Sequence, residues 1–197
     1  MRSTGIRSSL DLLTSAGQEG EADVLRSDVV TLSTPHGEAT LRDQTPNRPD
    51  PAPYLDGITV PEWFRLLNSR SYFFVDREDL DKLVDSYLER GIGQEVVTFE
   101  TRRLLGPVAD DVQVTTVSAG VFPRASGPSR GPKTFPSLAE FTGPVIKIKE
   151  VTITVPVTIS DRSVVSVVRR NPGEGPSRIW PPPRSSAPEA DAAQTAL

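Results

Sequence analysis

Residues 59–88 read TVPEWFRLLNSRSYFFVDREDLDKLVDSYL, and they indicate the fold class because their pattern predicts a helix, then a strand, then a second helix. Thr59 and Glu62 have the spacing of a capping box at the start of the first predicted helix. The aromatic and β-branched run at 72–75 predicts a buried strand. Asp76 is the expected N-cap of the second helix, whose apolar residues recur at helical spacing.

The flanking sequence contains a mixture of short strand and helix signals. They do not alternate in the regular way of a doubly wound sheet. We predict short helices at 6–13 and 101–105, proline-rich loops at 46–53 and 123–136, and strands at 29–32, 38–42, 95–100, 112–117, 145–155 and 163–168, with the last two paired. These elements predict an α+β fold with a mostly antiparallel sheet and short helices.

A change of composition near residue 170 sets the domain organisation. Residues 1–170 hold nearly all of the apolar sequence and predict a single domain. Residues 171–197 are rich in Pro, Ser, Ala and acidic side chains, so we expect a disordered C-terminal tail. Trp180 and the three prolines after it could present a polyproline ligand, but this composition favours a solvated linker.

The overall composition excludes several classes of function. The chain of 197 residues has a formal net charge of −4, no cysteine and one histidine, His36, which we place in a loop. This charge gives no general attraction for nucleic acid or an anionic membrane. The cysteine and histidine content excludes disulfides, thiol nucleophiles and the usual zinc sites, so we expect no metal. Without a membrane-length apolar run or a signal-like N-terminus, we expect a cytoplasmic protein, and the sequence gives no indication of its oligomeric state.

Two polar clusters flank the central helix and strand. Arg42-Asp43-Gln44 ends a predicted strand, and Asn68-Ser69-Arg70 directly precedes the buried strand. An arginine on a rigid element can clamp a carboxylate or a phosphate with its planar guanidinium group. The alternatives are structural: a surface turn at 42–44, which the local sequence favours, and a helix C-cap at Asn68 with a solvated Arg70.

A third candidate is Glu150, within the sequence KIKEVTITV of residues 147–155. Side chains alternate along a strand, so Glu150 shares a face with Ile146 and Ile148, whereas the apolar residues beyond it take the opposite face. This switch indicates a bulge near Glu150 and a partly desolvated carboxylate, a pattern that favours function. The alternative is a surface glutamate paired with a neighbouring lysine.

The same clusters carry a family resemblance. The sequences LRDQTP at 41–46 and WFRLLNSRSYFF at 63–74 resemble the "RDQ-P" and "LLN-R-FF" elements of a bacterial domain family without an established activity. Further matches follow in the same order, namely VTFET at 97–101, SAG at 118–120, RGPKTF at 130–135 and the Glu150 strand. The resemblance covers roughly residues 5–170.

A more distant similarity links this family to DarT-like ADP-ribosyltransferases and RNA 2′-phosphotransferases. Family members usually open with a "YH" strand and a helix that ends in "HGLLSTSALLD". Residues 5–13, GIRSSLDLL, match only the end of this opening, so we expect a chain that is truncated or degenerate at its N-terminus. The histidine that would bind the nicotinamide ribose is then missing. The strand beginning at Glu150 is similar to the catalytic-glutamate strand of the DarT-like group.

The resemblance implies an ADP-ribosyltransferase-like fold. It also implies an enzyme that cleaves the nicotinamide glycosidic bond of NAD and transfers the ADP-ribose to an unknown acceptor. Glu150 would stabilise the oxocarbenium-like transition state, Arg70 or Arg42 would hold the pyrophosphate or orient the glutamate, and Asn68 and Gln44 would be supporting contacts. A second hypothesis is a non-catalytic binding domain on a degenerate fold of this type. A third, an RNA 2′-phosphotransferase, requires a basic groove that the acidic balance disfavours.

Overall fold

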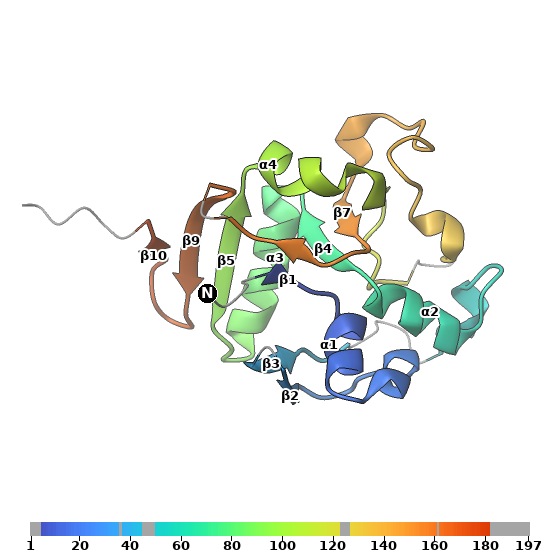
Figure 1. The fold of residues 1–197 in the computed structure, drawn as a ribbon, viewed down its shortest axis with the longest axis horizontal. Helices are drawn as coiled ribbons and strands as arrows, with labels where there is room; N and C mark the ends of the chain where they lie inside the picture. The colour runs from blue at the N-terminus through green and yellow to red at the C-terminus, as the bar shows by residue number, and fades with distance from the viewer. Residues whose placement is uncertain (1–4, 36, 45–49, 123–126, 161, 182–197) are drawn as a thin grey trace, which may run out of the picture.

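The computed structural model describes residues 5–35, 37–44, 50–122, 127–160 and 162–181, and shows antiparallel sheets joined by short helices (Figure 1). The α-helices are α1 (Ser9–Ser15), α2 (Val60–Asn68), α3 (Arg77–Glu89) and α4 (Thr101–Leu105). The strands are β1 (Gly5–Ile6), β2 (Val30–Thr34), β3 (Gly37–Leu41), β4 (Ser71–Phe74), β5 (Gln94–Phe99), β6 (Val112–Thr115), β7 (Glu150–Ile153), β8 (Val157–Thr158), β9 (Val164–Arg170) and β10 (Ser177–Trp180). Short 3-10 helices are η1 (Glu19–Asp23), η2 (Ala52–Tyr54), η3 (Gly106–Asp111), η4 (Pro132–Thr134) and η5 (Val145–Lys147). The predicted α+β class with antiparallel pairing is confirmed.

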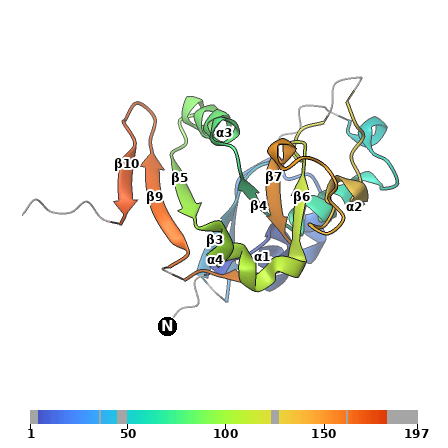
Figure 2. The same cartoon turned by 90° about the horizontal axis from the view of Figure 1, so that it is seen from above.

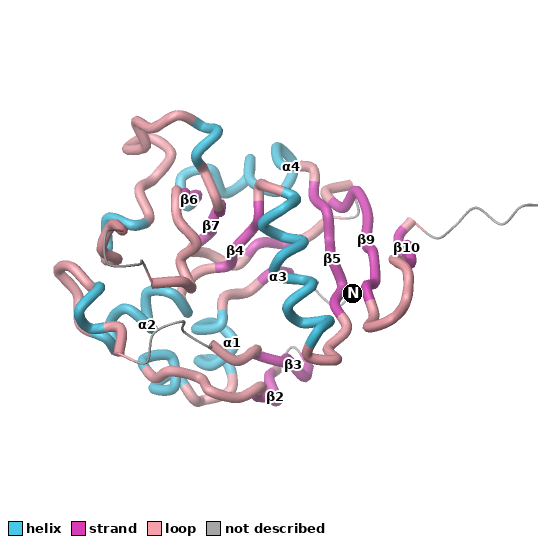
Figure 3. The backbone as a smooth tube through the Cα atoms, turned by 180° about the vertical axis from the view of Figure 1, so that it is seen from behind, coloured by secondary structure: helices cyan, strands magenta, loops and turns pink. Residues whose placement is uncertain are grey.

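The strands form two three-stranded sheets, ordered β4-β7-β6 and β10-β9-β5, and two small pairs, β1-β8 and β2-β3. Helix α3 lies between the two larger sheets and packs on β4 and β5, as the view from above shows (Figure 2). Seen from behind, the same helix lies between β4 and β5 (Figure 3). Within the described residues, no helix combines the length and the apolar character that crossing a membrane requires.

Local capping signals explain where the helices begin. The predicted Thr59–Glu62 capping box is confirmed, with the Thr59 amide donating to Glu62 Oε2 over 2.8 Å. The predicted cap at Asp76 is also confirmed, because its carboxylate accepts from the amides of the first turn of α3. Helix α1 begins at Ser9 rather than at residue 6, because Ser8 is its N-cap and Ile6 pairs with Val157 instead.

The β4-β7-β6 sheet has two unlike faces because its residues alternate. One face presents Phe73, Val112, Val151 and Ile153 to an apolar cluster with Leu104. The other face carries Tyr72, Gln113, Thr115, Glu150 and Thr152, which the pairing register sets side by side. An aromatic cluster of Trp63, Phe122 and Phe135 covers this polar face, with Tyr72 packed against it. Polar groups therefore lie between the sheet and an aromatic layer.

The prediction for residues 145–155 was wrong in extent and in pairing. Only 150–153 form a strand, because residues 145–147 turn as η5 after Pro144. Strand β7 pairs with β4 and β6, whereas β9 pairs with β5 and β10. Ile146 is 92% exposed, so the apolar stripe that was expected to bury Glu150 does not exist. Strand partners this far apart in sequence are chosen by tertiary packing, which local alternation does not report.

Regular secondary structure extends beyond residue 171, where we predicted the C-terminal tail to begin. Asn171, Pro172 and Gly173 form a turn, with Gly173 at φ +73°, and strand β10 returns antiparallel to β9. A Pro-Gly pair is a turn signal, and here it closes a hairpin. Residues 182–197 of the predicted tail lie outside the described residues, as does His36.

Candidate functional site

Asn68 and Arg70 are neighbours in sequence but point to different parts of the structure. Asn68 ends α2, is 2% exposed, donates through Nδ2 to the Ala22 carbonyl over 2.8 Å, and so fastens α2 to η1. Arg70 lies just before β4 and turns towards the β4-β7-β6 sheet, where Nε and Nη2 both donate to Gln113 Oε1. Its Nη1 donates to the Leu66 carbonyl, and the guanidinium lies 4.5 Å from the centroid of Phe135.

The residues of the Arg42-Asp43-Gln44 cluster make separate contacts with other elements. The Arg42 guanidinium stacks 4.4 Å from the ring centroid of Tyr87 on α3. Asp43 pairs with Arg90 across 3.1 Å just after α3, and Gln44 Nε2 donates to Asn68 Oδ1 over 3.0 Å. The cluster therefore ties the end of β3 to α3 and α2. Of the predicted cofactor residues, the structure brings Gln44 and Asn68 together and leaves Arg42 on another surface.

Glu150 is the first residue of the central strand β7, between Phe74 of β4 and Thr115 of β6. It is 6% exposed, and its Oε2 accepts from the Ala119 amide over 3.2 Å. Burial raises the pKa of the Glu150 carboxyl above its usual value, while hydrogen bonds from Ala119 and Ser118 and the charge of Arg130 oppose that shift. Glu150 is desolvated, as predicted, but for another reason. The aromatic cluster and the segment around Ala119 cover it, whereas Ile146 does not bury it.

Arg70 lies just before β4, whereas Glu150 pairs with the last residue of that strand. Glu150 pairs with Phe74, which follows Arg70 by four residues in the sequence. At about 3.3 Å per residue, their backbones are roughly 13 Å apart along the strand. Tyr72 lies between them, and its buried phenol donates to the Leu67 carbonyl. Burial raises the pKa of Tyr72, the charge of Arg70 lowers it, and the charge of Glu150 adds to the rise.

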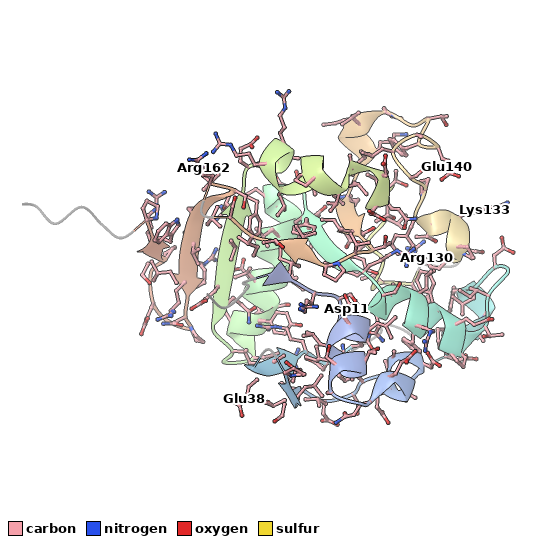
Figure 4. All side chains as sticks on the ribbon, in the orientation of Figure 1. Asp11, Glu38, Arg130, Lys133, Glu140 and Arg162 are labelled. Atoms are coloured by element: carbon pink, nitrogen blue, oxygen red, sulfur yellow. The ribbon has the colours of Figure 1, made fainter. Side chains whose placement is uncertain are left out.

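Arg130 is the site residue that the sequence reasoning missed, since it entered only as part of a motif. It is 5% exposed, and its guanidinium donates to the carbonyls of Pro128 and Val121. Figure 4 shows it inward of the exposed Lys133, on the segment that runs above α2. Burial lowers the pKa of Arg130, and the negative charge of Glu150 opposes this change. No local spacing signals its burial, because that follows from the docking of a long loop.

The described cavities lie away from Glu150. A broad surface depression of about 470 Å³ is lined by Arg42, Gly93, Gln94, Glu95, Arg169 and Asn171. A second cavity, of about 240 Å³, lies around the segment that follows η1 and is lined in part by Leu13, Leu25 and Arg26. Glu150 and Arg70 line neither of them. In the part of the chain that the structure describes, no group of three or more acidic or histidine side chains is arranged to hold a metal ion.

The family assignment agrees with the motifs. The chain belongs to a family of unknown function, DUF7002, whose model matches residues 1–164. Comparisons with curated proteins and with solved structures found no match. The family membership gives no activity.

Proposed function

We propose that this DUF7002 member is an ADP-ribosyltransferase-like enzyme that cleaves the nicotinamide glycosidic bond of NAD with Glu150 as its catalytic carboxylate. The observation that supports the proposal is a desolvated carboxylate at the start of a central strand, on the polar face of its sheet. Buried acids of raised pKa beside a charged partner gather at functional sites. The similarity of the Glu150 strand to the catalytic-glutamate strand of the DarT-like group supplies the reaction class.

The chemistry asked of Glu150 is electrostatic. The bond from the ribose C1′ to the nicotinamide nitrogen breaks, nicotinamide leaves with the electron pair, and positive charge develops at C1′. A carboxylate facing that carbon stabilises the charge and can accept a hydrogen bond from a ribose hydroxyl. An acceptor nucleophile, or water, then bonds to C1′ and loses its proton. Removing such a carboxylate costs on the order of 100-fold or more in rate.

Access to Glu150 requires its cover to move. The Ala119 amide occupies one oxygen of the carboxylate, and Phe122 of the same segment belongs to the aromatic layer. Displacing this segment exposes Glu150 together with Arg130, whose Nε has no hydrogen-bond partner among the described residues. Arg42, Gln44 and Asn68 then support the fold rather than the nucleotide.

The alternative is a non-catalytic binding domain, and a specific observation favours it as well. Arg70 places donors on protein acceptors at Gln113 and Leu66, and Glu150 is held by the Ala119 amide. Such contacts are typical of side chains that stabilise a fold. This hypothesis predicts no nicotinamide release from the chain.

Nicotinamide release from NAD separates the two candidates. The chain is incubated with NAD beside Glu150→Gln and a matched control, Glu38→Gln, whose exposed carboxylate lies on β3. The proposal expects release by the chain and the control, and a loss of about 100-fold in Glu150→Gln with its circular dichroism and melting curve retained. Equal release by all three proteins rejects Glu150 as the catalytic group. No release from any of the three proteins supports the binding domain.

A further inference from the structure

We propose that Arg130, and not Arg70, is the positioning residue for Glu150. This inference rests on the proposed function for its catalytic meaning, but the physical coupling it asserts can be measured without any turnover. The two side chains hold one short turn from its two ends, and both are buried.

The turn consists of residues 118–121, closed by the Val121 amide donating to the Ser118 carbonyl over 3.2 Å. Glu150 Oε2 accepts from the Ala119 amide over 3.2 Å, and Arg130 Nη2 donates to the Val121 carbonyl over 2.9 Å. The Glu150 carboxylate therefore accepts a hydrogen bond from an amide of the turn, and the Arg130 guanidinium donates one to a carbonyl of the turn. Loss of either side chain releases one end of the cover over the site.

The backbone of Arg130 is fixed independently of the turn. Its amide donates to the Tyr54 carbonyl over 2.8 Å, and its carbonyl accepts from the Asp56 amide over 2.8 Å. At Gly131, an added Cβ would lie 2.2 Å from the Asp56 carbonyl oxygen, so only glycine permits this approach. The guanidinium is thus delivered to the site by a rigid segment, which is what a positioning role requires.

Arg70 is unsuited to the same role. Its Nε and both terminal nitrogens are committed to Gln113, Leu66 and Ser69. It lies near the far end of β4 from Glu150, and the charge of its guanidinium acts on Tyr72. Arg130 is the cation whose charge opposes protonation of Glu150.

The test follows the protonation of Glu150 in the folded protein by carbon-13 NMR of glutamate side-chain carboxyls, with the Glu150 signal assigned by its absence from Glu150→Gln. The other titratable groups that act on Glu150 are Asp79 on α3, which pairs with Lys149, and Tyr72 on β4, so their contacts must stay intact. We compare Arg130→Gln with Arg162→Gln, which removes the same charge from an exposed position. Removing a nearby positive charge disfavours the carboxylate form.

The expected result is an upward shift of the Glu150 midpoint in Arg130→Gln, little shift in Arg162→Gln, and a midpoint in Arg130→Lys closer to that of the unsubstituted chain. A midpoint that moves no further in Arg130→Gln than in Arg162→Gln overturns the proposal. If Arg130→Gln does not fold, the Arg130 side-chain nitrogen signals of the unsubstituted protein decide. They must titrate with the Glu150 midpoint and lose that step in Glu150→Gln, and an absent step overturns the coupling.

The two proposals fail separately. An absence of nicotinamide release rejects the proposed enzyme but leaves the coupling between Glu150 and Arg130 measurable. With turnover present, Arg130→Gln shifts the acidic limb of the kcat/KM profile upward in step with the NMR midpoint. A purely structural role lowers turnover without moving that limb.

Discussion

Gln44 donates a hydrogen bond from Nε2 to Oδ1 of Asn68 over 3.0 Å, across 24 positions of sequence. Asn68 in turn donates to the Ala22 carbonyl, so one buried amide joins three segments of the chain. The backbone around Gln44 is tied as well, because its amide donates to the Arg26 carbonyl over 2.6 Å. Gln44 and Asn68, which belong to two different motif elements of the family resemblance, therefore hold the N-terminal segments against α2.

Replacing Asn68 by alanine is expected to lower the free energy of unfolding by about 1–3 kcal/mol, because the buried Ala22 carbonyl loses its side-chain donor. Urea unfolding measures the loss. Gln44→Ala and the double variant complete a cycle, and a coupling of at least about 0.5 kcal/mol is expected for groups in contact. Strict additivity contradicts the structural role assigned to the pair.

Gly131 gives a prediction with an internal control. An alanine Cβ there meets the Asp56 carbonyl oxygen at 2.2 Å, whereas one at Gly120 meets nothing within 4 Å. Gly131→Ala is expected to cost about 1–3 kcal/mol of stability, the usual range for overpacking. Gly120→Ala is expected to stay within about 0.5 kcal/mol. Similar unfolding curves for the two variants contradict the close approach of the segments around Asp56 and Gly131.

Local chemistry made part of this structure predictable. The capping box of Thr59 and Glu62 and the cap at Asp76 need only residues three positions apart, so the sequence contains the whole signal. The hairpin after Arg170 carried a signal of the same kind in Asn171-Pro172-Gly173, but the polar composition that follows masked it.

The candidate site was predictable only in part, because its partners are distant in sequence. Glu150 was found from its strand, yet the Ala119 amide and the Arg130 charge reach it through a loop whose path no periodicity encodes. Arg70 was found for a sound reason, as an arginine on a rigid element, but its donors are used on Gln113. Side-chain type and spacing identify candidates, and tertiary packing decides which of them meet.

Arg70 is expected to tolerate lysine poorly. Its guanidinium makes a paired contact with Gln113 Oε1 and stacks on Phe135, and an ammonium group reproduces neither geometry. Arg70→Lys should lower the free energy of unfolding by about 1–3 kcal/mol. Arg65→Lys makes the same substitution at a more exposed ion pair with Asp23 and should cost less. Equal losses of unfolding free energy in Arg70→Lys and Arg65→Lys would contradict a specific role for the Arg70 contacts with Gln113 and Phe135.

Glu150 gives a pH-dependent prediction whose sign follows from its burial. Folding raises the pKa of the Glu150 carboxyl, so the folded protein holds this proton more tightly than the unfolded chain. The resulting stability is complete below the ordinary carboxyl pKa of about 4.3 and is lost as pH rises through the folded pKa. The stability of Glu150→Gln relative to the unsubstituted chain should therefore increase as the pH rises from about 4 through the raised folded pKa. Urea titrations across this range check it, with Glu38→Gln, which removes an exposed carboxylate on β3, as the control. A falling difference contradicts the assigned burial.

We expect the C-terminal hairpin of β9 and β10 to stabilise the fold. Strand β10 pairs with β9 from Ser177 to Trp180, although Trp180 remains 42% exposed. A chain that ends at Arg170 leaves the outer edge of β9 unpaired, and an unpaired edge invites association with other chains. We expect this truncation to lower the melting temperature and to increase light scattering on heating. A chain that ends at Pro181 keeps the hairpin and is the matched comparison. Identical melting curves for the two truncations would show that β10 adds no stability, because the longer one differs only by the hairpin turn and that strand.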